Sequence, residues 1–213
     1  MMLFTQVPSP LFLLLVLSAT LVGQVRHQHH PPRNASEYAG ALEDASRDVW
    51  QKPHEVLEAL ALQPGEVVAD IGAGTGYFTR RFARHGASVL AVDVEQSLFE
   101  KHWQGGEENV SKVLAKLEDP TLPAGGVDTV FFCNVVHHIE SRPAYFAKVR
   151  HALKSGGRVV VLDFHMRDLP VGPPPAMKLS REAMIGEWKA AGFHLSAEKG
   201  FLPYQYFLEF RLK

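Results

Sequence analysis

The chain has 213 residues, of which 22 are Lys or Arg and 23 are Asp or Glu, so its formal net charge at pH 7 is −1. This balance argues against a dedicated nucleic-acid surface, which needs clustered basic residues. Beyond an N-terminal segment, roughly 190 residues remain, which is enough for one hydrophobic core but not comfortably for two. The single cysteine, Cys133, cannot form an internal disulfide.

The N-terminal segment contains an apolar, leucine-rich run at residues 11–22. The run is too short to span a bilayer comfortably, and its position is typical of a signal peptide, after which the domain would be exported. No Lys or Arg precedes the run, whereas Arg26 and Arg33 follow it, which favours an uncleaved anchor with the domain at the cytoplasmic membrane face. We therefore expect residues 1–24 to be either a signal peptide or a membrane anchor.

Residues 25–52 are expected to be a linker followed by a lid helix, ahead of a catalytic domain at residues 53–213. The linker holds His27, His29 and His30. Such a cluster can bind metal, but without a fixed scaffold a polar spacer is favoured, and no metal site is predicted.

The most informative segment begins with the apolar run Val67–Ile71, which predicts a buried parallel strand because it is β-branched and lacks polar alternation. The run includes Asp70 near its end, and a glycine-rich turn follows. Gly72, Gly74 and Gly76 allow positive φ and let a ligand lie against the backbone and the N-terminus of the next helix. The segment therefore predicts a cofactor cradle.

The glycine spacing distinguishes two cofactor classes. The dinucleotide fingerprint is G-x-G-x-x-G/A, with a small third residue for close packing of helix on strand. Here the glycines fall as G-x-G-x-G and Tyr77 stands where the small residue would be, which disfavours a nicotinamide cofactor. A second predicted strand, Ser88–Val92, ends at Asp93, about 20 residues after the loop, where an acid meets ribose hydroxyls in either class.

Strands and helices continue to alternate along the chain, as a parallel sheet with helices on both faces requires. The predicted elements are a third strand over Val110–Lys116, a fourth over Val127–Asn134, a helix over Pro143–Lys154 stopped by Gly156 and Gly157, a fifth strand over Arg158–Phe164, and a last, antiparallel strand over Tyr204–Phe210.

Three of these segments together resemble the class I S-adenosylmethionine-dependent methyltransferases. They are Asp70 before the G-x-G-x-G loop, the run Asn134–Ile139, and the Leu-Lys-x-Gly-Gly-x-Val-Val-Val pattern at residues 153–161. The resemblance extends from about Pro53 to the C-terminus and is nearest to small-molecule methyltransferases of the quinone-biosynthesis type. It implies a Rossmann-like, doubly wound α/β sheet of seven strands, mostly parallel with an antiparallel last strand, and S-adenosylmethionine as the cofactor.

The resemblance also implies which residues hold the cofactor: Asp70, Gly72, Ala73, Gly74, Thr75, Gly76, Asp93, Glu118, Asp119 and Asn134. Asp70 would order the glycine loop or meet the amino group of the ligand, and Asp93 would bind the ribose diol. Glu118 or Asp119 would bind the adenine amino group, and both stay open because the local spacing departs from the commoner pattern. Asn134 would touch the methionine part.

Candidate catalytic residues are His138 and His165, which are preferred, and His137; they follow the fourth and fifth strands. In methyl transfer the cofactor brings the activated carbon, and the protein aligns the nucleophile, excludes water and sometimes removes a proton. Imidazole has a suitable pKa for that last task, although each histidine could equally be structural. No Asn-Pro-Pro-Tyr motif follows the fourth strand, which disfavours adenine or glutamine nitrogen as the acceptor.

The expected function is therefore methyl transfer to oxygen or carbon of a small acceptor, with a lipophilic one favoured by the apolar residues Met166, Leu169 and Met177. Two alternatives stay open. One is a non-catalytic protein that binds S-adenosylmethionine or acts as a scaffold, because no residue by itself establishes a general base. The other is a nicotinamide-dependent oxidoreductase, which Tyr77 disfavours. The oligomeric state is not predicted.

Overall fold

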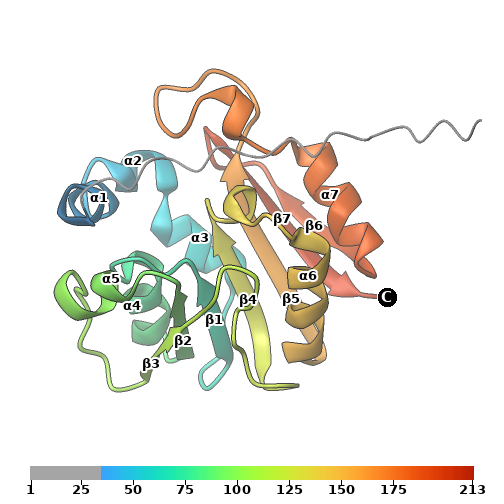
Figure 1. Cartoon of the computed structure of the whole chain (residues 1–213), viewed down its shortest axis with the longest axis horizontal. Coiled ribbons are helices and arrows are strands. Elements are labelled where there is room, and N and C mark those ends of the chain that lie inside the picture. Colours follow the sequence, from blue (N-terminus) through green and yellow to red (C-terminus); the bar gives the residue numbers. More distant parts are fainter. Residues whose placement is uncertain (1–34) are drawn as a thin grey trace, which may run out of the picture.

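A computed structural model describes residues 35–213 (Figure 1). The predicted signal peptide or anchor and the histidines near residue 30 lie outside the described residues. Among residues 35–213, no helix is long and apolar enough to cross a membrane.

The described chain alternates helices and strands from α3 onwards. The strands are β1 (Val67–Ile71), β2 (Ser88–Asp93), β3 (Val110–Leu114), β4 (Val127–Cys133), β5 (Leu153–Phe164), β6 (Phe193–Lys199) and β7 (Gln205–Leu212). The helices are α1 (Ala35–Leu42), α2 (Arg47–Gln51), α3 (Pro53–Leu60), α4 (Tyr77–Arg84), α5 (Gln96–Lys101), α6 (Arg142–Ala152) and α7 (Arg181–Ala190), with 3-10 turns η1 (Val136–His138) and η2 (Pro175–Met177).

The seven strands form one sheet in the order β3-β2-β1-β4-β5-β7-β6. Strands β1 to β5 pair in parallel with their neighbours, and β7 is antiparallel to both β5 and β6. The predicted fold, including the antiparallel strand near the C-terminus, is confirmed. Because the strand order reverses between β1 and β4, the carboxyl ends of these two strands flank the crevice in which open α/β sheets bind ligands.

The core has two layers because side chains of the central strands alternate between the faces of the sheet. Val68 and Phe131 pack on the face covered by α3 and α4, whereas Ile71 and Phe132 pack on the face covered by α6 and α7. On the second face the fully buried Trp188 of α7 stacks on an α6 phenylalanine. Two apolar layers hold the sheet rigid, so its carboxyl edge is a fixed platform for the site.

The predicted boundary between the helix and the fifth strand was wrong, because the strand begins at Leu153 and not at Arg158. The helix expected over Pro143–Lys154 runs from Arg142 to Ala152, so Gly156 and Gly157 do not stop it. Leu153, expected on the helix, is buried and pairs with Val127 as the first residue of β5. Sheet pairing at this position outweighs the helical periodicity that Leu153 shares with α6.

Candidate functional site

The loop between β1 and α4 has the backbone that its glycines predicted. Gly72, Gly74 and Gly76 have φ values of 72°, 58° and 94°. Their neighbours are close: a Cβ on Gly72 would lie 2.2 Å from a methyl group of Val135, and a Cβ on Gly74 would lie 2.8 Å from a methyl group of Leu42. Side chains would therefore be excluded here twice, by backbone conformation and by space.

Asp70 lies at the bottom of this loop and is only 3% exposed. Its carboxylate accepts a hydrogen bond of 2.6 Å from the Thr79 hydroxyl, which ties the first turn of α4 to the end of β1. Burial raises the pKa of Asp70 to about 7, although the Thr79 hydroxyl and the nearby Arg47 cation act in the opposite direction. Any cationic group that comes close to Asp70 would stabilise the ionised form of this buried carboxylate.

Asp93, at the end of β2, is hydrogen-bonded within the protein. One carboxylate oxygen accepts from the Gly74 N–H at 2.8 Å, and the other accepts from the Glu95 N–H at 2.9 Å. Burial raises the pKa of Asp93, whereas these N–H groups lower it. The side chain thus links the glycine loop to the turn after β2.

Glu118 and Asp119 follow β3 at one end of the sheet. Asp119 accepts a hydrogen bond from the Thr121 N–H at 2.8 Å and pairs with Lys148 of α6 at 3.0 Å, and these groups keep its pKa below the usual value. The Glu118 side chain is exposed, and only its carbonyl contacts Lys148. The geometry does not choose between the two acids.

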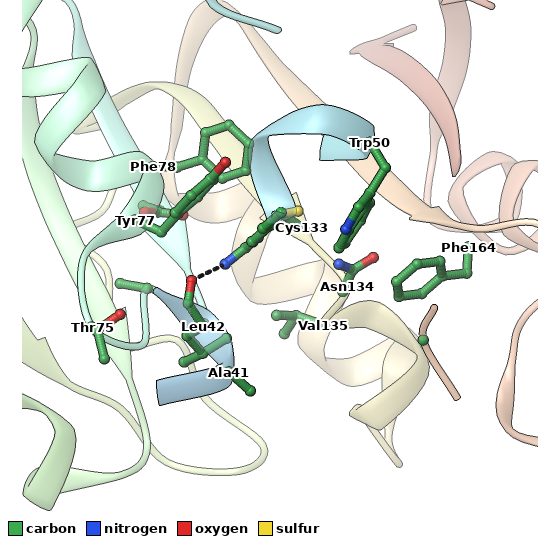
Figure 2. A pocket seen from close by; sticks show the side chains of 15 residues that line it. Ala41, Leu42, Trp50, Thr75, Tyr77, Phe78, Cys133, Asn134, Val135 and Phe164 are labelled. Carbon is green, nitrogen blue, oxygen red and sulfur yellow. Dashed lines mark hydrogen bonds between the residues drawn. The ribbon is translucent and has the colours of Figure 1, made fainter. Parts of the chain in front are cut away.

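A cavity of about 210 Å³ opens beside the glycine loop (Figure 2). It brings together five of the predicted residues, namely Asp70, Gly72, Ala73, Thr75 and Asn134. Residues 41–50, which include α1 and α2 residues, form the opposite wall. Its volume is below the roughly 300–1,000 Å³ typical of ligand pockets, because this segment lies directly over the loop.

The lining of the cavity has mixed chemistry. Trp50, Val135 and Phe164 contribute apolar surface, with the Trp50 and Phe164 rings 5.7 Å apart. Arg47 and Asp70 contribute a cation and an acid. Such a cavity suits a ligand that carries both charged groups and apolar surface.

Helices α1 and α2 are fastened to α4 and the glycine loop by ionic contacts, as a lid would be. Glu43 pairs with Arg80 at 2.7 Å and accepts a hydrogen bond from the Thr75 hydroxyl. Asp48 accepts a hydrogen bond from the Tyr77 hydroxyl. The Tyr77 ring also lies between two guanidinium groups, those of Arg47 at 3.8 Å and Arg81 at 4.0 Å.

Three buried polar residues near the cavity were not predicted from the sequence: Arg47, Gln51 and Gln205. Gln51 Nε2 donates to Gln205 Oε1 at 2.6 Å, and Gln205 Nε2 donates to Asn134 Oδ1 at 2.6 Å. Gln205 could have been noticed, because it is a polar residue on the same face of an alternating strand as the buried Phe207. Arg47 and Gln51 belong to the segment that was expected to form a lid, but neither was predicted as a binding residue.

None of the three candidate histidines lines this cavity. His137 is buried, and its Nδ1 is 2.9 and 3.0 Å from the two carboxylate oxygens of Asp163. His138 is exposed, and its ring lies 4.1 Å from that of His137. Burial and the Arg167 cation lower the pKa of His165. His137 thus has a carboxylate partner on one ring nitrogen.

Comparisons with known proteins agree with this geometry. The family model described as a methyltransferase domain matches residues 69–161. An uncharacterized methyltransferase of Geobacillus sp. is 25% identical over 154 residues, which are 71% of this chain and 68% of that protein. A demethylmenaquinone methyltransferase of Corynebacterium glutamicum is 30% identical over 123 residues, or 58% of this chain and 51% of that protein. The matched region thus spans about two thirds of the first relative and about half of the second.

Solved structures show the same fold. A SAM dependent methyltransferase from Aquifex aeolicus superposes with a TM-score of 0.78 at 21% identity, over 84% of this chain and 98% of that one. A DhpI-SAH complex superposes with a TM-score of 0.67 at 25% identity, over 84% and 91% of the two chains.

Proposed function

Because the chain belongs to the class I S-adenosylmethionine-dependent methyltransferases, we propose that it transfers the methyl group of S-adenosylmethionine to oxygen or carbon of a small, lipophilic acceptor. The observation that carries the acceptor class is the apolar surface that Trp50, Val135 and Phe164 contribute to the cavity lining. A ring carbon or a carboxyl oxygen fits this proposal, since the relatives include a demethylmenaquinone methyltransferase and a malonyl-[acyl-carrier protein] O-methyltransferase.

The residues present fit the cofactor, because Asp70, Gly72 and Asn134 line one cavity and so place an acid, a side-chain-free backbone and an amide beside each other. The cofactor supplies the activated methyl carbon. We assign its amino group to Asp70, its methionine part to the loop and Asn134, and its ribose to Asp93. For the ribose, the bond from the Gly74 N–H to Asp93 must be shared with or exchanged for a hydroxyl.

The adenine amino group is assigned to Glu118 or Asp119. Asp119 would have to leave Lys148 in order to bind it. The Glu118 side chain is exposed, and Lys148 bonds its backbone carbonyl oxygen.

Where the acceptor must lose a proton, we assign that step to one of His138, His165 and His137, of which His137 has a defined carboxylate partner. When Nδ1–H of His137 donates to Asp163, Nε2 is left as the basic nitrogen and the ring is held in one orientation. A carboxylate that fixes the tautomer and orientation of an imidazole is one feature of a general base.

The test is calorimetric titration of the full chain with S-adenosylmethionine and S-adenosylhomocysteine, beside Asp93→Ala and the control Asp128→Ala. Asp128 bonds Val67 N–H and Lys154 at the opposite edge of the sheet. We expect binding of both ligands by the wild type and Asp128→Ala, and much weaker binding by Asp93→Ala. Transfer of labelled methyl to quinols and to carboxylic acids then identifies the acceptor atom. A folded protein that binds neither ligand refutes the proposal.

We further propose that residues 11–22 bring the catalytic domain to a membrane, either as an anchor at the cytoplasmic face or as a signal peptide that directs export. The support is the apolar run itself, together with Arg26 and Arg33 that follow it. Sedimentation with membranes and the mass of the mature N-terminus separate the two. A full-length chain that stays in the supernatant contradicts both.

A further inference from the structure

A chain of buried side chains runs from the lid to the cavity, and its hydrogen bonds have a fixed direction. The guanidinium of Arg47 only donates. Gln51 Oε1 lies 3.5 Å from Arg47 Nη2 and 3.6 Å from the Cys133 thiol, which also donates to it. The oxygen of the Gln51 amide therefore faces these donors, and its nitrogen faces the other way.

The direction passes through the next amide. Gln51 Nε2 donates to Gln205 Oε1, so Gln205 turns its nitrogen towards Asn134 and donates to Asn134 Oδ1, each time at 2.6 Å. Gln51 is 0% and Gln205 1% exposed, so water cannot replace a partner that is turned the wrong way. Flipping either amide would bring oxygen against oxygen and nitrogen against nitrogen in a dry place.

Asn134 is the last side chain in this hydrogen-bonded series, and it lines the cavity. Its oxygen is used by Gln205, so its Nδ2 group is the part left to bind a ligand. In the view of Figure 2 this nitrogen is on the side of Cys133 and the oxygen on the side of Phe164. The backbone of Asn134 has a φ of 59°, which few residues other than glycine and asparagine adopt readily. This backbone conformation orients the amide directly after the last residue of β4.

Arg47 and Asp70 line the same cavity as Asn134. The cavity therefore has an amide donor of fixed orientation, a cation and an acid in its lining. We propose that Asn134 and Arg47 together bind a carboxylate, and that Gln51 and Gln205 are positioning residues that keep Asn134 as a donor. Resting on the proposed function, this group is the α-carboxylate of S-adenosylmethionine, while the ammonium beside it goes to Asp70. A cation and an acid on one cavity match the two charges of an amino acid.

The test compares S-adenosylhomocysteine with its analogue that lacks the α-carboxylate, by calorimetric titration of the full chain. We expect the wild type to bind the carboxylate-bearing ligand roughly 30-fold more tightly, as loss of a charge-assisted pair implies. Gln205→Met lies outside the cavity lining, and we expect it to reduce this preference to about fivefold or less. The control Thr129→Val also removes a buried hydrogen bond, at the amino end of β4, and should leave the preference unchanged.

A second variant, Asn134→Asp, keeps the size of the side chain but replaces the donor with an acceptor, and should also lose the preference. Equal binding of the two ligands by the wild type overturns the proposal. So does a full preference in Gln205→Met or Asn134→Asp. Binding of neither ligand refutes the proposed function itself, which is a different result from equal binding of both.

Discussion

Gly72→Ala tests whether the glycine loop is set by space as well as by backbone conformation. At φ 72°, an alanine costs about 1–2 kcal/mol. Its Cβ would also lie 2.2 Å from Val135 Cγ2, whereas ordinary contact is 3.4–4 Å. The end of β4 must therefore move by over an ångström, which adds about 1–3 kcal/mol of overpacking. The sum is about 2–5 kcal/mol, measured by urea denaturation.

Gly65→Ala is the matched control. Gly65 has a φ of 81°, but a Cβ there meets nothing within 4 Å, so only the conformational cost of about 1–2 kcal/mol remains. Adding Val135→Ala to Gly72→Ala should recover part of the lost unfolding free energy, because it removes the Val135 methyl group with which the new Cβ would collide. Equal losses of unfolding free energy in Gly72→Ala and Gly65→Ala would refute the steric argument.

Three further predictions concern ionisable groups. Because the pKa of Asp70 is about 7 in the folded chain and 3.8 in the unfolded chain, stability relative to Asp70→Asn should be greatest below pH 3.8 and fall until about pH 7; a flat difference in denaturation midpoints would contradict this. Asp163→Ala should lower the free energy of unfolding by about 3 kcal/mol, since it strips His137 of a buried partner, and a double-mutant cycle with His137→Ala that is additive would deny the coupling. Glu43→Gln should cost about 1 kcal/mol or less yet speed hydrogen exchange in residues 35–51; unchanged exchange there would mean that the Arg80 contact does not hold the lid.

The fold could be predicted because its signals are local. The run before Asp70, the glycine spacing and the successive apolar strands are each written within about a dozen residues, and the parallel order follows from their alternation with helices. The end of α6 was wrong because Leu153 satisfies helical periodicity and strand pairing equally, and only the position of Val127, 26 residues earlier, decides between them.

The polar chain behind Asn134 could not be predicted for the same physical reason. Gln51 and Gln205 meet across 154 residues of sequence, and neither lies in a motif. What makes them informative is their burial and the direction of their hydrogen bonds. Both are properties of packing between the lid and the sheet, which no local pattern records.

The place of β7 in the sheet has a consequence for synthesis of the chain. β7 is made after β6 but lies between β5 and β6, so β6 has no partner in the sheet and β5 keeps an open edge until β7 arrives. An open strand edge is a template for pairing with other chains. Gln205 lies on this strand, so its bond to Asn134 can form only when β7 pairs. Closing of the sheet edge and orientation of the Asn134 amide are thus one event, and a chaperone that shields the edge of β5 would act before it.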